Sequence, residues 1–160
     1  CRIVDIHEFL LEKGIRLEGG GAYLYHDPCH SPMKQQDPMK TVKALVGEQV
    51  LKSDRCCGES GTLGVTRPDI STQIRFRKEE EIRKGEAALR ASGAVGERDN
   101  IKILTSCPSC LQGMHRFTDD AGGLEPDYIV IELAKHILGE NWLPEYVNRA
   151  NNGGIERVLL

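Results

Sequence analysis

The chain has 160 residues, with 24 acidic and 21 basic side chains and a formal net charge of −3. That length suits one domain with an apolar core and is short for two ordinary domains. No basic patch stands out, so nucleic acid is not expected as a partner. No apolar run approaches the ~18 residues that suggest a membrane span. Because the first residue is Cys1 rather than Met, we expect the native N-terminus to be missing.

Helix-like and strand-like patterns alternate along the chain. The expected elements are a helix over 1–14, a strand at 22–26, a helix over 38–47 capped by Asp37, a strand at 48–53, a long helix over 67–91, a strand at 101–106, a helix over 108–117 and a mostly helical segment over 127–139. This order predicts an α/β fold with a small, open, mainly parallel sheet flanked by helices on both faces. In such sheets function gathers at the carboxyl ends of the strands.

The long helix over 67–91 has three recognisable features. Thr66 and Asp69 have the spacing of a capping box at its start. The stretch "RFRKEEEIRK" carries charge pairs at i,i+4, such as Arg75 with Glu79, and predicts a solvated face. A broken apolar stripe is formed by Ile70, Ile74, Ile82 and Leu89.

Five of the six cysteines lie in three compact motifs that also contain glycine or proline, "HDPCH", "CCGESG" and "CPSC". Each motif follows a predicted strand, and parallel strands end at the same edge of a sheet, so these thiols are expected to converge. They are Cys29, Cys56, Cys57, Cys107 and Cys110. The grouping favours metal or redox chemistry in a reducing compartment over a secreted disulfide framework.

Thiolate sulfur is a soft ligand that suits iron–sulfur clusters and zinc. Cys107 and Cys110 could bind one metal or cluster from a single turn, and the helix that begins there favours the thiolate of Cys107. Cys56 and Cys57, as neighbours, could ligate different atoms of one cluster, and the glycines beside them offer backbone N–H groups. Each motif taken alone is also compatible with a redox dithiol or with buried structural thiols.

The three motifs in this order resemble the cysteine-rich CCG domain. That domain occurs in heterodisulfide reductase, in the iron–sulfur subunits of glycolate oxidase and anaerobic glycerol-3-phosphate dehydrogenase, and in lactate-utilisation proteins. The resemblance covers about 3–138. It implies an iron–sulfur centre, in some members a noncubane [4Fe-4S] cluster and in others zinc. The implied ligands are Cys29, Cys56, Cys57, Cys107 and Cys110.

The chain is similar in particular to the C-terminal part of fused proteins that carry an FAD-linked oxidase domain and ferredoxin-type clusters. The resemblance implies a single domain over 1–160, excised from a longer protein, with its core at 3–138 and a tail at 139–160. It implies an electron-transfer domain of a flavin-dependent oxidoreductase of the 2-hydroxy acid dehydrogenase type. FAD would belong to the parent protein only, and this chain would be a partial module rather than a complete enzyme. Its partners would be the other domains or subunits, in the cytoplasm or at the inner face of the membrane.

Two other functions stay open at this point. A structural zinc domain that binds a partner would use the same cysteines. A thiol–disulfide redox domain would use Cys107 and Cys110, because "CPSC" before a helix is also typical of thioredoxin-like sites.

Several side chains beside the motifs have two interpretations. His26 and His30 flank Cys29 as hydrogen-bonded turn residues or as possible zinc ligands, and His30 is the better candidate for a ligand. Glu59 is expected to be a solvated loop carboxylate, with a role as proton carrier as the alternative. Trp142 is expected to anchor the tail to the core.

Overall fold

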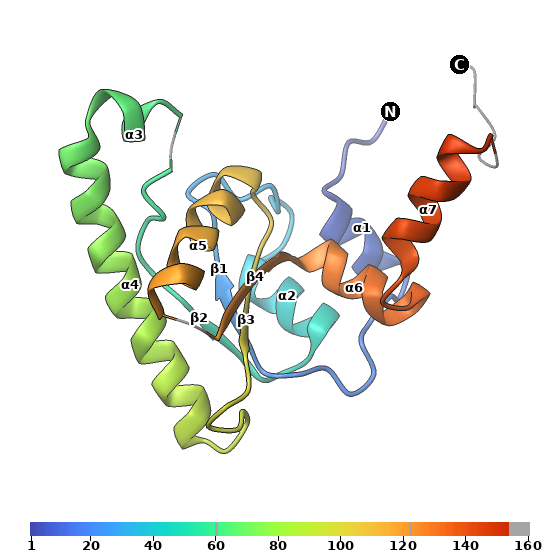
Figure 1. Ribbon diagram of the computed structural model, residues 1–160. Coiled ribbons are helices and arrows are strands. Elements are labelled where there is room, and N and C mark those ends of the chain that lie inside the picture. Colours follow the sequence, from blue (N-terminus) through green and yellow to red (C-terminus); the bar gives the residue numbers. More distant parts are fainter. Residues whose placement is uncertain (60, 122, 154–160) are drawn as a thin grey trace.

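The computed structural model describes residues 1–59, 61–121 and 123–153 of the chain. Their centre is a four-stranded sheet in which every neighbouring pair is parallel, with the order β2-β1-β3-β4 (Figure 1). The strands are β1 (Tyr23–His26), β2 (Val50–Lys52), β3 (Ile101–Thr105) and β4 (Leu124–Tyr128). The predicted α/β fold with a small, open, parallel sheet is therefore confirmed.

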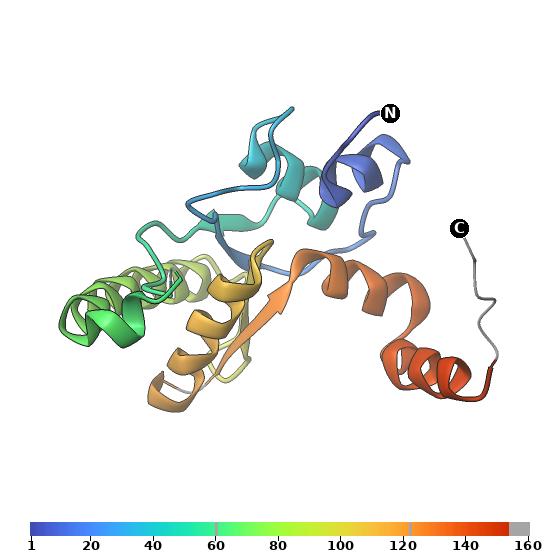
Figure 2. The same cartoon turned by 90° about the horizontal axis from the view of Figure 1, so that it is seen from above.

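Helices cover both faces of the sheet (Figure 2). They are α1 (Ile6–Glu12), α2 (Pro38–Val46), α3 (Leu63–Thr66), α4 (Pro68–Ala91), α5 (Pro108–Ala121), α6 (Ile129–Leu138) and α7 (Trp142–Asn151). α1, α2 and α6 pack on one face, and α4 and α5 pack on the other. None of the helices in the described part of the chain combines the length and the apolar character that crossing a lipid bilayer requires.

Strand alternation divides the apolar core into two clusters, one on each side of the sheet. In β1, Tyr23 and Tyr25 join the cluster beneath α1, α2 and α6, whereas Leu24 joins the cluster beneath α4 and α5. Successive side chains of a strand point to opposite faces, so this division follows directly from the sequence order. All four residues of β1 are buried, as expected of a strand in a parallel sheet with both faces covered. By the same alternation, His26 falls on the face of α4 and α5.

The order of the strands creates a topological switch point next to β1. The chain leaves β1 toward β2 through α2 on one face, and it leaves β3 toward β4 through α5 on the other face. Between these two units, α4 carries the chain across from β2 to β3. Open α/β sheets keep their ligand sites in the crevice at the carboxyl ends of the strands where the direction of winding reverses. In this fold that crevice lies between the ends of β1 and β3.

Two helix starts show how far the capping rules hold. Asp37 caps α2, because its Oδ1 accepts a hydrogen bond of 2.9 Å from the backbone N–H of Lys40. The predicted capping box of Thr66 and Asp69 is wrong. Thr66 ends the short helix α3 and its hydroxyl donates to the Thr62 carbonyl at 3.1 Å, while Asp69 pairs with Arg67. A second helix directly before α4 thus occupies the residue that would have served as the cap.

Two elements of the C-terminal part were not predicted. Strand β4 contains Pro126 between two acidic residues, a composition that weakens the strand signal, and it is tolerated because β4 lies at the edge of the sheet. Helix α7 follows the core, and none of its residues is buried. Trp142, its first residue, is only partly buried. It is the least exposed residue of α7, and its role as an anchor of the tail stays a prediction.

The triple glycine before β1 makes a close contact that gives a test of the fold. A Cβ atom on Gly20 would overlap the backbone carbonyl oxygen of Val46 at the end of α2, whereas one on Gly21 would meet only the Tyr23 ring at 3.5 Å. We expect Gly20→Ala to lower the free energy of unfolding by about 1–3 kcal/mol in urea titrations, as overpacking does. Gly21→Ala is the matched control, and equal losses in the two variants would contradict the packing described.

Candidate metal centre

The five motif cysteines line a single pocket of about 170 Å³ at the carboxyl end of the sheet. Cys29 follows β1, the adjacent pair follows β2, and the last two lie between the end of β3 and the first turn of α5. The full set is Cys29, Cys56, Cys57, Cys107 and Cys110. Cys1 is exposed and does not line this pocket. The convergence expected from the strand order is thus observed, and the role of these thiols as ligands stays a prediction.

Four of the thiols form two close pairs that differ in exposure. The inner pair, Cys57 and Cys110, has its sulfur atoms 3.5 Å apart, and both residues are buried. The outer pair, Cys29 and Cys56, has its sulfur atoms 4.0 Å apart, with Cys29 exposed and Cys56 partly exposed. Cys107 is partly exposed as well. The pocket therefore has a closed inner end and an open outer end.

Glycines give the Cys56-Cys57 segment the shape that it needs. Gly58 has a φ of +80°, and its backbone N–H lies 3.4 Å from the sulfur of Cys56. A Cβ atom there would approach the Ser71 carbonyl oxygen to 3.2 Å, so both the conformation and the space favour glycine. On the other side, Gly113 lets α5 approach the segment, because a Cβ atom on it would lie 2.7 Å from Cγ of Glu59.

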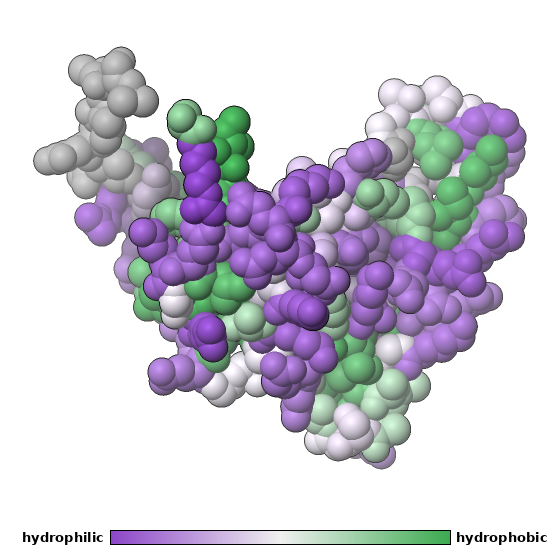
Figure 3. All heavy atoms as spheres, turned by 180° about the vertical axis from the view of Figure 1, so that it is seen from behind, coloured by the Kyte–Doolittle hydropathy of each residue, from purple (hydrophilic) through white to green (hydrophobic). Residues whose placement is uncertain are grey.

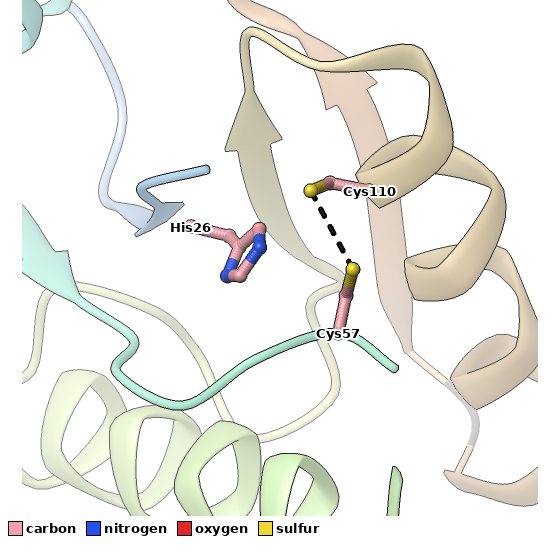
Figure 4. Close-up of side chains that lie close together, drawn as sticks. All are labelled: His26, Cys57 and Cys110. Atoms are coloured by element: carbon pink, nitrogen blue, oxygen red, sulfur yellow. Dashed lines mark hydrogen bonds between the residues drawn. The ribbon is translucent and has the colours of Figure 1, made fainter. Parts of the chain in front are cut away.

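His26 joins the inner pair. The residue is 1 % exposed, and neither ring nitrogen has a hydrogen-bond partner among the described residues. One of its nitrogens and the sulfur atoms of Cys57 and Cys110 all lie within 4.8 Å of one another, and the three side chains face one another (Figure 4). The sequence favours His30 as the ligand, but His30 is exposed at the outer end of the pocket. The interpretation of His26 as a hydrogen-bonded turn residue is wrong.

The inner pair shares a negative charge unequally. The hydrogen bond between Cys57 and Cys110 outweighs burial and lowers the pKa of Cys57 to about 4, and the nearby imidazole of His26 lowers it further. The same hydrogen bond, together with burial, raises the pKa of Cys110 well above its usual range. In the outer pair, burial raises the pKa of Cys56. The lowered pKa of Cys57 favours a thiolate at the inner end, hydrogen-bonded to Cys110, and a thiolate there is a suitable donor for a cation.

Two charged side chains lie closer to the site than the sequence indicates. Glu59 lines the pocket and forms an ion pair with Arg116 of α5, and its side chain is only 11 % exposed, so the expectation of a solvated carboxylate is wrong. Lys78 of α4 is completely buried. Lys78 belongs to the charge run that the sequence assigns to a solvated face, and that assignment is wrong at this position.

The predicted pair of Arg75 with Glu79 is not among the ion pairs of the described residues. Arg75 instead lies over the ring of Phe117, 6.0 Å from its centroid, and Glu79 pairs with Arg83. The buried positions of α4 are Ser71, Lys78, Ile82, Glu86 and Leu89. They recur at helical spacing, but three of them are polar, so a search for apolar periodicity finds only part of this face.

The donor set fits a metal centre. Five sulfur donors line one pocket. The buried imidazole of His26, whose nitrogens have no hydrogen-bond partner among the described residues, lies beside two of these donors. Its volume of about 170 Å³ is several times the ~30 Å³ that one water molecule occupies in the liquid. The pocket can therefore take a group larger than a lone ion. A dithiol site of Cys107 and Cys110 is less well supported, because the sulfur of Cys110 pairs with Cys57 on another segment.

Comparison with known proteins gives two family matches. The CCG model, described as a cysteine-rich domain, matches residues 23–115 and so includes the three cysteine motifs. A second model, a domain of unknown function (DUF3400), matches residues 115–160. No solved structure matches the chain.

Three curated relatives are similar to the chain. A fumarate reductase (CoM/CoB) subunit of Methanothermobacter marburgensis is 31 % identical over 117 residues, which are 68 % of this chain and 21 % of that protein. The glycolate oxidase iron-sulfur subunit of Escherichia coli is 27 % identical over 58 % of this chain and 25 % of its own length. The probable glycolate oxidase iron-sulfur subunit of Bacillus subtilis is 23 % identical over 84 % and 28 %. The chain thus spans between about a fifth and just over a quarter of these relatives.

The inner pair predicts a distinctive pH dependence of stability in metal-free, reduced protein. The pKa of Cys57 falls from its usual value near 8.5 to about 4 on folding. This stabilisation is complete above pH 8.5 and is lost as the pH falls through 4. Because the folded-state pKa of Cys110 is raised, its contribution is complete below pH 8.5 and is lost as the pH rises above that value.

We therefore expect the free energy of unfolding to rise between pH 4 and pH 8.5 and to fall above pH 8.5. Urea titrations across this range measure it. Cys57→Ala should flatten the rise, whereas Cys1→Ala, at an exposed position, should leave the profile unchanged. A profile identical in wild type and Cys57→Ala would contradict the shared charge of the inner pair.

Proposed function

Because the chain belongs to the cysteine-rich CCG domain family, we propose that it is an electron-transfer module that holds an iron–sulfur centre within a larger oxidoreductase. The observation that carries the proposal is the convergence of five thiols from three chain segments on one pocket. Two of the similar proteins are iron-sulfur subunits by name. An iron–sulfur centre bound there would supply reversible one-electron transfer.

The proposed ligands are Cys29, Cys56, Cys57, Cys107 and Cys110. Buried and exposed ligands have different roles in this proposal. The inner pair holds its side of the centre away from water, where one thiolate is already present. The outer pair faces the open end of the pocket, where an electron donor or acceptor can approach. Five thiols exceed the four that a simple cubane requires, which supports a noncubane [4Fe-4S] arrangement as the finer proposal.

The parent protein is proposed to supply the flavin and the substrate site. Electrons from a 2-hydroxy acid would reach this module from FAD through ferredoxin-type clusters and leave to a quinone or another carrier. Large apolar side chains are exposed near the site at the α3–α4 end, among them Val65, Ile70 and Phe76 (Figure 3). Ile74 and Arg77 lie at this end as well, and they line a surface hollow together with Cys56. An apolar surface beside the open end of the pocket supports docking of another domain or subunit there.

Zinc is the second candidate, and one observation favours it. His26, Cys57 and Cys110 place three donor atoms within 4.8 Å of one another, and a mixed histidine and cysteine set is typical of zinc. A structural zinc ion would stabilise the fold and would carry no electrons.

The composition of the centre is tested by anaerobic purification followed by iron, sulfide and zinc assays. We expect iron with stoichiometric sulfide, and we expect Cys57→Ser and Cys110→Ser to lose most of it because they remove the inner pair. Cys1→Ser is the control and should retain the wild-type content. Stoichiometric zinc without sulfide would overturn the electron-transfer proposal and support the structural alternative.

The two histidines give a second test of the same site. Co²⁺ binds thiolate and imidazole sites and reports its ligands in the visible spectrum, so it can be titrated into the reduced, metal-free protein. We expect His26→Gln to weaken Co²⁺ binding by about 10- to 100-fold, as loss of a group that contacts or orients the ligands does. His30→Gln, at the exposed outer end, should change the affinity little. A larger loss of Co²⁺ affinity in His30→Gln than in His26→Gln would identify His30 as the metal ligand instead.

A further inference from the structure

Lys78 makes an unusual set of contacts beneath the Cys56-Cys57 segment. Its side chain is 0 % exposed, and its Nζ donates to the Ser53 carbonyl at 2.7 Å, to the Ser53 hydroxyl at 2.8 Å and to the Asp54 carbonyl at 2.7 Å. All three donor positions of the ammonium group are therefore used. The three acceptors lie on the two residues that follow β2 and lead into the cysteines.

All three acceptors of Lys78 are neutral groups, two backbone carbonyls and one hydroxyl. A buried cation usually needs an opposite charge beside it, because desolvation of an ion is costly. The carboxylate of Asp54 pairs with Lys52 at the surface instead. Burial lowers the pKa of Lys78 to about 8. Nearby acidic groups oppose this shift because they favour the charged ammonium form, and they are Cys57, Asp54, Cys110 and Glu81. Of these groups, Cys57 of the inner pair has the largest effect on the pKa of Lys78.

The same face of α4 also holds the other end of the cysteine segment. Ser71 lies two turns before Lys78, and its hydroxyl donates to the carbonyl of Gly58 at 2.9 Å. Lys78 thus fixes the residues before the two cysteines, and Ser71 fixes the residue after them. Both contacts are buried and come from one continuous helix, so the distance between the two anchor points is set by helix geometry.

We propose that Lys78 is a positioning residue of the metal centre, which anchors the Cys56-Cys57 segment and places a buried positive charge behind its sulfur ligands. This inference rests on the proposed function for the identity of the centre, but the anchoring contacts belong to the chain itself. Cysteine-ligated clusters carry net negative charge, so a fixed cation nearby stabilises the reduced, more negative state. Lys78 therefore holds the ligands and raises the reduction potential.

The anchoring is tested in reduced, metal-free protein by amide hydrogen exchange over residues 53–58. Lys78→Met removes the charge and all three hydrogen bonds while keeping most of the side-chain volume, and we expect exchange in this segment to become about tenfold faster. The matched control is Lys84→Met on the exposed side of the same helix, which should leave the exchange of this segment unchanged. Equal exchange in the two variants would overturn the anchoring.

If Lys78→Met does not fold, Ser53→Ala tests the anchoring instead, because this variant removes the hydroxyl acceptor and keeps the ammonium group of Lys78. Unchanged exchange over residues 53–58 in a folded Ser53→Ala protein would then overturn the anchoring. Faster exchange confined to this segment would support it. Thermal unfolding of each variant shows whether the loss is local or global.

The effect of the charge is tested by redox titration of anaerobically reconstituted protein. We expect Lys78→Met to lower the reduction potential, whereas Lys78→Arg, which retains the charge, should restore much of it. Ser71→Ala should loosen the segment and leave the potential near the wild-type value, which separates position from charge. Equal potentials in Lys78→Met and Lys84→Met would overturn the electrostatic role. If no iron–sulfur centre forms in the wild type, the proposed function fails, and the exchange measurements still judge the anchoring.

Discussion

Parallel pairing of β1 with both of its neighbours is the constraint on which the site depends. β1 pairs with β2 from Tyr23 opposite Val50, and it pairs with β3 up to His26 opposite Thr105. Because all three strands run in the same direction, the chain emerges from each of them at the same edge and delivers a cysteine motif there. An antiparallel neighbour would send its motif to the opposite edge, a full strand length away. The pocket therefore exists because α2 and α4 each carry the chain back to the amino end of the sheet, so that the next strand again runs toward the pocket.

Much of this arrangement could be predicted from the sequence, because it follows from order and local pattern. The three cysteine motifs each come after a β-prone stretch, and Asp37-Pro38 marks a helix start that the structure confirms. β4 was missed because Pro126 hides the strand signal, and edge strands tolerate what central strands do not. Such tolerance depends on the position of the strand in the sheet, which a local pattern does not contain.

The sequence ranks His26 below His30 as a ligand and places Lys78 on a solvated face, because the burial of such polar groups is decided by tertiary packing. His26 lies on the same side of β1 as Leu24, and only the placement of α4 and α5 shows that this side also holds the inner pair. Lys78 stands among arginines and glutamates most of which are exposed or form ion pairs, and nothing in the neighbouring sequence distinguishes it. Hydrophobic periodicity identifies which face of a helix is buried, but it has no means of identifying a buried cation on that face.

The difference in burial between the two thiol pairs also determines how the proposed centre would come apart. Oxidants reach accessible sulfur atoms first, so damage would begin at the exposed Cys29 and then at the partly exposed Cys56 and Cys107, while Cys57 and Cys110 stay covered. The buried side chains of His26, Cys57 and Cys110 would still lie together behind the damaged thiols. A disulfide between Cys29 and Cys56, whose sulfur atoms lie 4.0 Å apart, would be restored by a reductant, whereas oxidation of either thiol beyond the sulfenic acid would not be. The more accessible cysteines would thus be oxidised ahead of the two buried ones and would delay the loss of the inner pair.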